Sequence, residues 1–190
     1  MVLSRFVYLP LSYFMNPDIE NLFDQRLDSC NYQYWMDIAS KDKAVFNTFW
    51  EITKGDKYEN NWRALWIIEN AIKKDKNLLN DILFELYQLI VSTDNNSLRR
   101  MALKLICKKT IINDDISSKV LNKCESFILN NKIPVAVRAN AIQYFYQFCK
   151  IEKDLINELT IILDHISEQE NTPAMISKIK NTRKAIAKIR

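Results

Sequence analysis

Three short stretches of this 190-residue chain repeat one pattern, and that pattern decides the fold. The stretches are Trp62–Trp66 (WRALW), Leu98–Ala102 (LRRMA) and Val137–Ala141 (VRANA). Each begins with an apolar residue and an arginine, continues with two further residues and ends on a residue suited to packing. The arginines are separated by 36 and then 39 residues. A period of this length is typical of proteins that are built from stacked structural repeats.

The sequence around these stretches predicts helices. Apolar side chains in 78–90 and in 137–148 have the spacing that places them on one face of a helix. Each motif opens one helix, and a second helix is predicted to follow it, over Asn77–Val91, Ser117–Leu129 and Lys153–Ile166. A two-helix unit of this length cannot bury its apolar face alone. We therefore predict an all-α fold, a HEAT-like α-α superhelix or solenoid of about ten helices.

The scarcity of glycine excludes several function classes. The chain has one glycine, Gly55, and four prolines, against usual shares of roughly 7% and 5%. Loops that bind phosphates or dinucleotides need several glycines, because the backbone N–H groups must approach the phosphate closely. Tight hairpin turns also favour glycine, so a β-rich domain is not expected. Gly55 itself is predicted to end a helix just before the repeats begin.

We expect residues 1–190 to form a single α-solenoid domain with three parts. Residues 1–57 supply N-terminal helices, 58–170 the HEAT-like repeats, and 171–190 a basic capping helix. From Asn171 onward the chain has six basic residues and no acidic one, whereas the part before it has 21 basic and 23 acidic residues. Basic residues near a helix C-terminus interact favourably with the helix dipole, so a solvated terminal helix explains this excess most simply.

Proline and apolar residues mark two further helices. Asn16-Pro17 and Thr172-Pro173 each place a capping side chain before a proline at the first helical position. The first fifteen residues are mostly apolar but are interrupted by Arg5 and Pro10. We expect this stretch to be a helix that packs on the domain rather than a signal peptide, with membrane attachment as the alternative.

Four segments resemble those of a known protein group. They are Asn61–Glu69, Leu98–Ala102, Val137–Phe148 and Lys178–Arg190. In these segments the chain is similar to small HEAT-like helical proteins of bacteria, and the resemblance extends over roughly residues 20–190. It implies a helical-repeat fold. Some of these proteins carry the label adenylosuccinate lyase, which would imply a mobile Gly- and Ser-rich loop with a catalytic serine, together with catalytic histidines. With one glycine and one histidine, this chain is not expected to have lyase activity.

The sequence offers little support for an enzyme, a metal site or a cofactor. His165 is the single histidine, and its position near a predicted helix C-terminus favours a solvent-facing side chain. The cysteines are scattered and form no zinc-binding pattern, at Cys30, Cys107, Cys124 and Cys149. Reduced, mostly buried thiols indicate a cytoplasmic protein. We read the acidic pairs Asp114-Asp115 and Glu168/Glu170 as residues that cap helices and solvate turns.

The candidate binding residues are an aromatic residue, the repeat arginines and the basic end of the chain. The first group is Trp62, Arg63, Arg99 and Arg138, and the second is Lys178, Lys180, Arg183, Lys184, Lys188 and Arg190. The arginines could line a binding groove. We favour an internal role, in which each guanidinium bonds turn carbonyls or an acid such as Asp94, five residues before Arg99.

These observations favour a non-enzymatic scaffold or adaptor that binds a protein or peptide partner. The alternative is a nucleic-acid-binding protein, possible because of the basic C-terminal half and the Trp62-Arg63 pair, in the manner of HEAT-like DNA alkylation-repair proteins. Neither function requires a cofactor.

Overall fold

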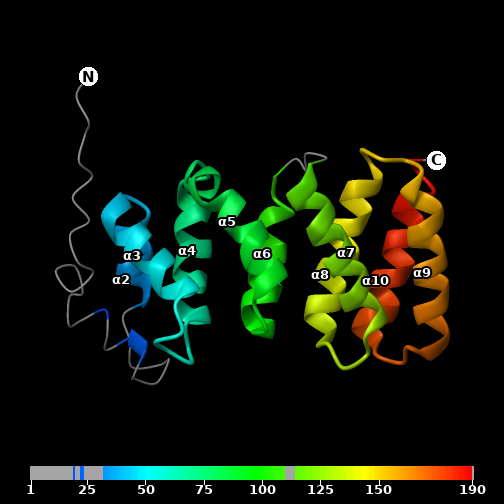
Figure 1. Ribbon diagram of the computed structural model, residues 1–190, viewed down its shortest axis with the longest axis horizontal. Coiled ribbons are helices and arrows are strands. Elements are labelled where there is room, and N and C mark those ends of the chain that lie inside the picture. The colour runs from blue at the N-terminus through cyan, green and yellow to red at the C-terminus, as the bar shows by residue number, and fades with distance from the viewer. Residues whose placement is uncertain (1–18, 20–21, 24–31, 110–113, 190) are drawn as a thin grey trace. The chain divides into compact units, whose positions relative to one another are not determined.

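The computed structural model describes residues 19, 22–23, 32–109 and 114–189 (Figure 1). Within these residues the protein has nine α-helices and no β-strand, which confirms the all-α prediction. The helices are α2 (Tyr32–Ala39), α3 (Lys43–Lys54), α4 (Trp62–Lys74), α5 (Leu78–Ser92), α6 (Asn96–Ile106), α7 (Asp115–Leu129), α8 (Val135–Cys149), α9 (Leu155–Gln169) and α10 (Pro173–Ile186). The predictions for the first fifteen residues, Asn16-Pro17, Cys30 and Arg190 lie outside the described residues.

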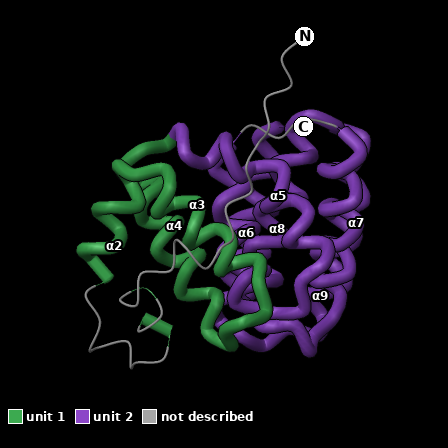
Figure 2. Tube along the Cα trace, turned by 60° about the vertical axis from the view of Figure 1, so that its left-hand side comes forward, with its two compact units in different colours: residues 1–76 green, residues 77–190 purple. Residues whose placement is uncertain are grey.

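The chain divides into two compact units, Met1–Lys76 and Asn77–Arg190, which Figure 2 shows in different colours. The first contains α2, α3 and α4, and the second contains α5 to α10. The single domain over residues 1–190 stays a prediction.

In the first unit, α2, α3 and α4 pack on one another around a core of large apolar side chains. Phe46 and Phe49 of α3 and Leu65 of α4 are fully buried. Helix α3 begins where the Asp42 carboxylate accepts hydrogen bonds from the backbone N–H groups of Ala44 (2.8 Å) and Val45 (3.2 Å). These bonds satisfy two of the N–H groups that a helix start leaves without an intrahelical partner.

Gly55 ends α3, as predicted, but in an extended conformation with φ −83° and ψ 158°. Its N–H donates to the Glu51 carbonyl at 3.0 Å. No described residue, Gly55 included, has a positive φ. The described turns therefore need no glycine, which is consistent with how rare this residue is in the chain.

The second unit consists of two layers of helices. One layer is α6, α8 and α10, in which α8 contacts both of the others, and the second is α5, α7 and α9, in which α7 contacts both of the others. Contacts of α5 with α6, α7 with α8 and α9 with α10 join the layers. Aromatic residues of α8 fill the space between them, and Tyr144, Phe145 and Phe148 are all buried. This arrangement buries apolar faces that a separate helix pair would leave in water.

Side-chain caps begin two helices of this unit. Asn95 accepts from the N–H groups of Ser97 and Leu98 at the start of α6, and Asp114 accepts from that of Ser117 in α7. Thr172 precedes Pro173 at the start of α10, as predicted, but it makes no capping bond. Its hydroxyl instead donates to Glu170 Oε1 at 2.7 Å. None of the described helices is long and apolar enough to cross a membrane.

Candidate functional site

Arg138, near the start of α8, is buried and connects the end of α7 to the loop between α9 and α10. Its Nε donates to the Ile128 carbonyl at the end of α7 (3.1 Å), and its Nη1 donates to Glu170 Oε2 (2.7 Å) in the loop between α9 and α10. Hydrogen bonds from the Thr172 N–H and hydroxyl, together with the Arg138 guanidinium, hold the pKa of Glu170 below its ordinary value. Arg138 is only 6% exposed, so its side chain is used mainly inside the fold.

Arg99 has the same place in α6 but a different set of contacts. Its Nη2 donates to Asp94 Oδ1 (2.7 Å) and its Nη1 to Asn96 Oδ1 (3.2 Å), both close to the start of its own helix. Its guanidinium carbon lies 4.9 Å from the centre of the Phe127 ring in α7, which gives a cation–π contact. Arg99 is 7% exposed, so this arginine too is used inside the fold.

Arg63 completes the series in the first unit. Its Nη1 donates to the Leu22 carbonyl at 3.0 Å, with the Tyr32 hydroxyl 3.4 Å away. Trp62 is half-buried, and its ring centre lies 6.0 Å from the Arg63 guanidinium carbon. The Trp66 ring packs at 5.2 Å from that of Tyr32. Each of the three arginines thus bonds a backbone carbonyl or an acid inside the fold, which agrees with the internal role that we favoured. A binding role for Trp62 and these arginines stays a prediction.

Residues 19–186 match the family described as HEAT repeat domain. The chain belongs to the HEAT repeat domain family. No curated protein and no solved structure matches the chain. The match covers the three arginine motifs and all nine described helices, from the start of α2 to the end of α10. The predicted HEAT-like helical-repeat fold is therefore confirmed.

The basic residues at the end of this HEAT repeat chain differ in exposure and contacts, and their role as one basic patch stays a prediction. Lys178 Nζ donates to Gln143 Oε1 of α8 at 2.6 Å, and burial lowers the pKa of Lys178 while nearby Cys107 raises it. Arg183 Nη2 donates to Asp164 Oδ1 of α9 at 2.6 Å. Lys180, Lys184 and Lys188 are exposed, and Arg190 lies outside the described residues. Two cations of this helix thus bind neighbouring helices, Lys178 on α8 and Arg183 on α9, and three lysines face solvent.

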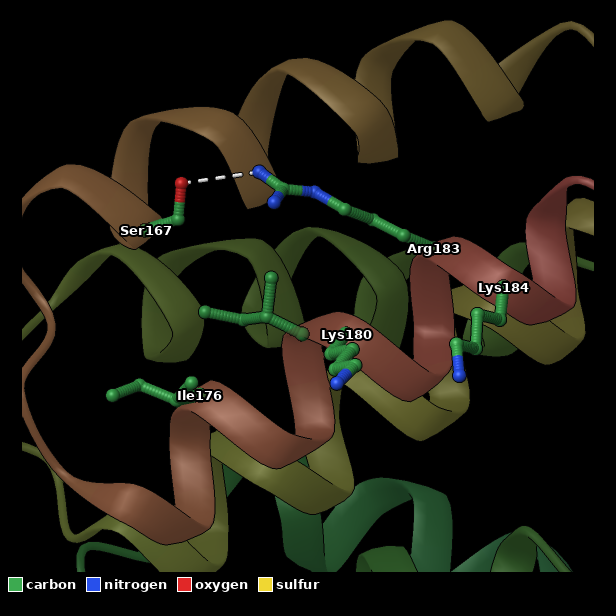
Figure 3. Close-up of a pocket in the computed structure, with 6 residues that line it drawn as sticks. Ser167, Ile176, Lys180, Arg183 and Lys184 are labelled. Carbon is green, nitrogen blue, oxygen red and sulfur yellow. Dashed lines mark hydrogen bonds between the residues drawn. The ribbon is translucent and has the colours of Figure 1, made fainter.

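Two of these lysines line a pocket on α10. The pocket has a volume of about 410 Å³ and is lined by Ser167 of α9 and by Ile176, Ile179, Lys180, Arg183 and Lys184 of α10. Arg183 reaches toward α9 and donates to Ser167 Oγ at 3.0 Å, the bond drawn in Figure 3. The pocket combines apolar surface with positive charge, which suits a ligand that has both an apolar and an anionic part.

The sequence analysis missed a row of amides on α8 that bind neighbouring helices. Asn140 donates to the Arg100 carbonyl of α6 and Gln147 to the carbonyl of Cys107, which directly follows α6, both at 2.9 Å, while Gln143 accepts from Lys178 of α10. The three amides follow the i, i+3, i+7 spacing that places them on one side of a helix. That spacing was a signal for contacts between repeats.

The second-helix layer, defined as α5, α7 and α9, exposes one large apolar side chain on each helix. Phe84 of α5 is 60% exposed, Leu129 of α7 44% and Ile161 of α9 69%. A single exposed apolar residue is ordinary on a protein surface. An exposed apolar side chain on each of three successive helices of one layer is more informative. Repeat proteins bind their partners on extended surfaces to which successive repeats contribute.

The described cysteines are buried or half-buried, which affects their reactivity. Burial raises the pKa of Cys107 and of Cys149 to about 12, and that of buried Cys124 also well above its ordinary value. Such thiols are poor nucleophiles at neutral pH. His165 is exposed near the end of α9, as predicted. Within the described residues, no three His, Cys, Asp or Glu side chains gather in a way that could hold a metal ion.

Proposed function

We propose that this HEAT repeat protein is a scaffold or adaptor that binds a protein or peptide partner. The observation that carries the proposal is the set of exposed apolar side chains on the second-helix layer, Phe84, Leu129 and Ile161. Large apolar side chains at a protein interface contribute much of the binding energy when a partner removes them from water. Phe84 is the best candidate for a central contact, because aromatic residues are enriched in interfaces.

A nucleic-acid function receives less support. Phosphate binding needs solvent-accessible arginines and lysines, since these release the counterions of the nucleic acid. The guanidinium groups of Arg63, Arg99 and Arg138 are buried and hydrogen-bonded inside the fold. The second-helix layer also exposes the acid Glu158 one helical turn before Ile161 on α9. This carboxylate would repel a phosphate backbone at that position.

The proposal can be tested by photo-crosslinking with the full chain. A benzophenone amino acid is placed at position 84 or 161, and as a control at position 47, where Asn47 is exposed on α3. In cells of the source organism, we expect one and the same protein to crosslink from positions 84 and 161 and not from position 47. That protein is then purified and its affinity for the chain is measured by calorimetry.

The substitutions Phe84→Ser and Ile161→Ser should each weaken this affinity by roughly tenfold or more, as expected for interface residues that contribute strongly. Because both side chains are exposed, the variants should keep the melting temperature of the parent chain. Absence of a common crosslinked protein, or equal affinity of the parent and both variants, would refute the proposal.

A further inference from the structure

We propose that the α10 pocket, defined by Ser167, Ile176, Ile179, Lys180, Arg183 and Lys184, binds an acidic peptide segment that carries one aliphatic side chain. The inference rests on the proposed function, since it takes the chain to be a binder of protein segments. It adds a second surface to the second-helix layer and names the chemistry of its ligand.

The apolar part of the pocket can hold one side chain. Ile176 is 49% exposed and supplies the open apolar surface of the pocket, while Ile179, one helical turn further along α10, is only 3% exposed and lies behind it. The volume of about 410 Å³ is at the low end of the range of roughly 300–1,000 Å³ for small-ligand pockets. An aliphatic side chain placed there would cover Ile176, whose exposure to water is unfavourable.

The charged part of the pocket selects an anionic ligand. Lys180 and Lys184 follow Ile176 at i+4 and i+8, so all three lie on the same side of α10, and Figure 3 shows Lys180 between Ile176 and Lys184 along the helix. Both lysines are exposed, and neither has a hydrogen bond or an ion pair to a side chain in the described part of the protein. They are therefore available to pair with carboxylates on one side of an aliphatic residue that covers Ile176.

Arg183 and Ser167 form the fixed wall of the pocket. Arg183 Nη2 contacts three acceptors of α9, namely the Leu163 carbonyl (3.3 Å), Asp164 Oδ1 (2.6 Å) and Ser167 Oγ (3.0 Å). Ser167 in turn donates to the Asp164 carbonyl at 2.8 Å. These bonds hold the Arg183 side chain against α9, which leaves the two lysines to recognise the ligand.

A peptide fits this pocket better than a nucleic acid does. A phosphate backbone has no aliphatic side chain to cover Ile176, which is 49% exposed. A peptide can place carboxylates over Lys180 and Lys184 and an aliphatic side chain over Ile176.

The test is an NMR titration of the full chain, labelled with ¹⁵N and with ¹³C in the isoleucine methyl groups. The probe is the peptide acetyl-Glu-Glu-Asp-Leu-Glu-Asp-Glu-amide. We expect chemical-shift changes at the methyl groups of Ile176 and Ile179 and at the amides of 176–184. Replacing the peptide leucine with serine, or its acids with the matching amides, should each weaken binding by roughly fivefold or more, because each removes one part of the recognition.

Charge-reversal variants locate the binding. Lys180→Glu/Lys184→Glu should weaken binding of the peptide by roughly tenfold, since each exposed ion pair contributes up to about fivefold. The matched control is Lys119→Glu/Lys153→Glu, which reverses two exposed lysines outside the pocket with the same change of net charge. We expect it to change the affinity by less than about twofold at physiological salt, where distant charges are screened.

Absence of peptide binding would overturn the inference, and so would three other results. The first is shift changes that map elsewhere on the chain, and the second is an equal loss of affinity in the pocket variant and its control. The third is a short DNA duplex that shifts the same isoleucines more strongly than the peptide does, which would assign the pocket to nucleic acid. Crosslinking from positions 84 and 161 does not depend on this pocket. Failure of the peptide to bind therefore overturns this inference and leaves the proposed function standing. Failure of the crosslinking refutes the proposed function and is measured in a separate experiment.

Discussion

Arg99 and Arg138 have the same position in two successive repeats and the same distance of 2.7 Å to a carboxylate, but their acidic partners differ in exposure. The side chain of Asp94 is fully exposed at 101%, whereas that of Glu170 is only 6% exposed. Water screens the attraction between exposed charges, so an equal distance does not mean an equal contribution to stability.

The two arginines also connect different parts of the fold. Arg99 bonds to residues at the start of its own helix and adds a contact with Phe127 of α7. Arg138 bonds to the end of α7 through Ile128 and to the loop between α9 and α10 through Glu170, 32 residues away. The repeat motif thus determines where the cation lies, and the loops determine what it binds. We expect Arg138 to matter more for stability.

The largest effect is expected for Arg138→Ala. This substitution leaves the buried Glu170 carboxylate and the Ile128 carbonyl without their guanidinium partner, and breaking a buried ion pair in this way costs about 3–5 kcal/mol. Urea unfolding followed by circular dichroism measures the loss. Arg99→Ala is the matched comparison and should cost about 1–2 kcal/mol, from the cation–π contact and the packing of the side-chain stem. Equal losses for the two variants would contradict the argument from exposure.

A smaller and pH-dependent effect is expected for Glu170→Gln. The pKa of Glu170 lies below its ordinary value of 4.5, so the carboxylate stabilises the fold above that pH and loses this contribution as the pH falls through the lowered value. At pH 7 the substitution should cost about 2 kcal/mol, the scale of hydrogen bonds to a charged group. As the pH falls well below 4.5, the parent chain and the variant should converge.

The measurement is the free energy of unfolding in urea over this pH range. Glu168→Gln provides the control, because Glu168 is an exposed carboxylate of the same segment. Its effect should be within about 0.5 kcal/mol at every pH, as for an ordinary surface substitution. A difference between the parent chain and Glu170→Gln that stays constant as the pH falls would show that the charge of Glu170 is not what stabilises the fold.

The contacts that the sequence predicted are mostly local. The bond between Asp94 and Arg99 was anticipated because both residues lie at the start of one helix, and the structure confirms it at 2.7 Å. Glu170 was expected to cap a helix or solvate a turn, and its bond to Arg138 depends on how α8 and the loop before α10 pack. The α10 pocket was missed for the same reason, because only packing shows which side of α10 is covered by α9.

Helix ends illustrate the same limit. Helix α9, the second helix of the last repeat, was predicted over Lys153–Ile166 and is observed over Leu155–Gln169. The prediction ended the helix early because Glu168 and its neighbours are polar, but Glu and Gln are good helix formers, so the helix continues through Gln169. Asn77–Val91 is observed over Leu78–Ser92, one residue later at both ends. Apolar spacing locates a helix well, and polarity alone locates its ends less well.

The smallest effect is expected for Asp94→Ala. The Asp94 carboxylate is fully exposed, so removing it returns Arg99 Nη2 to water or to Asn96 at a cost of about 0.5 kcal/mol.

The informative measurement is the coupling energy in two double-mutant cycles, one for Asp94 with Arg99 and one for Glu170 with Arg138. We expect coupling below about 1 kcal/mol in the first cycle and clearly more in the second. High salt should reduce only the coupling of the exposed pair, because screening acts on charges that water reaches. If both cycles gave the same coupling and the same response to salt, burial of the acid would not be what distinguishes the two arginines.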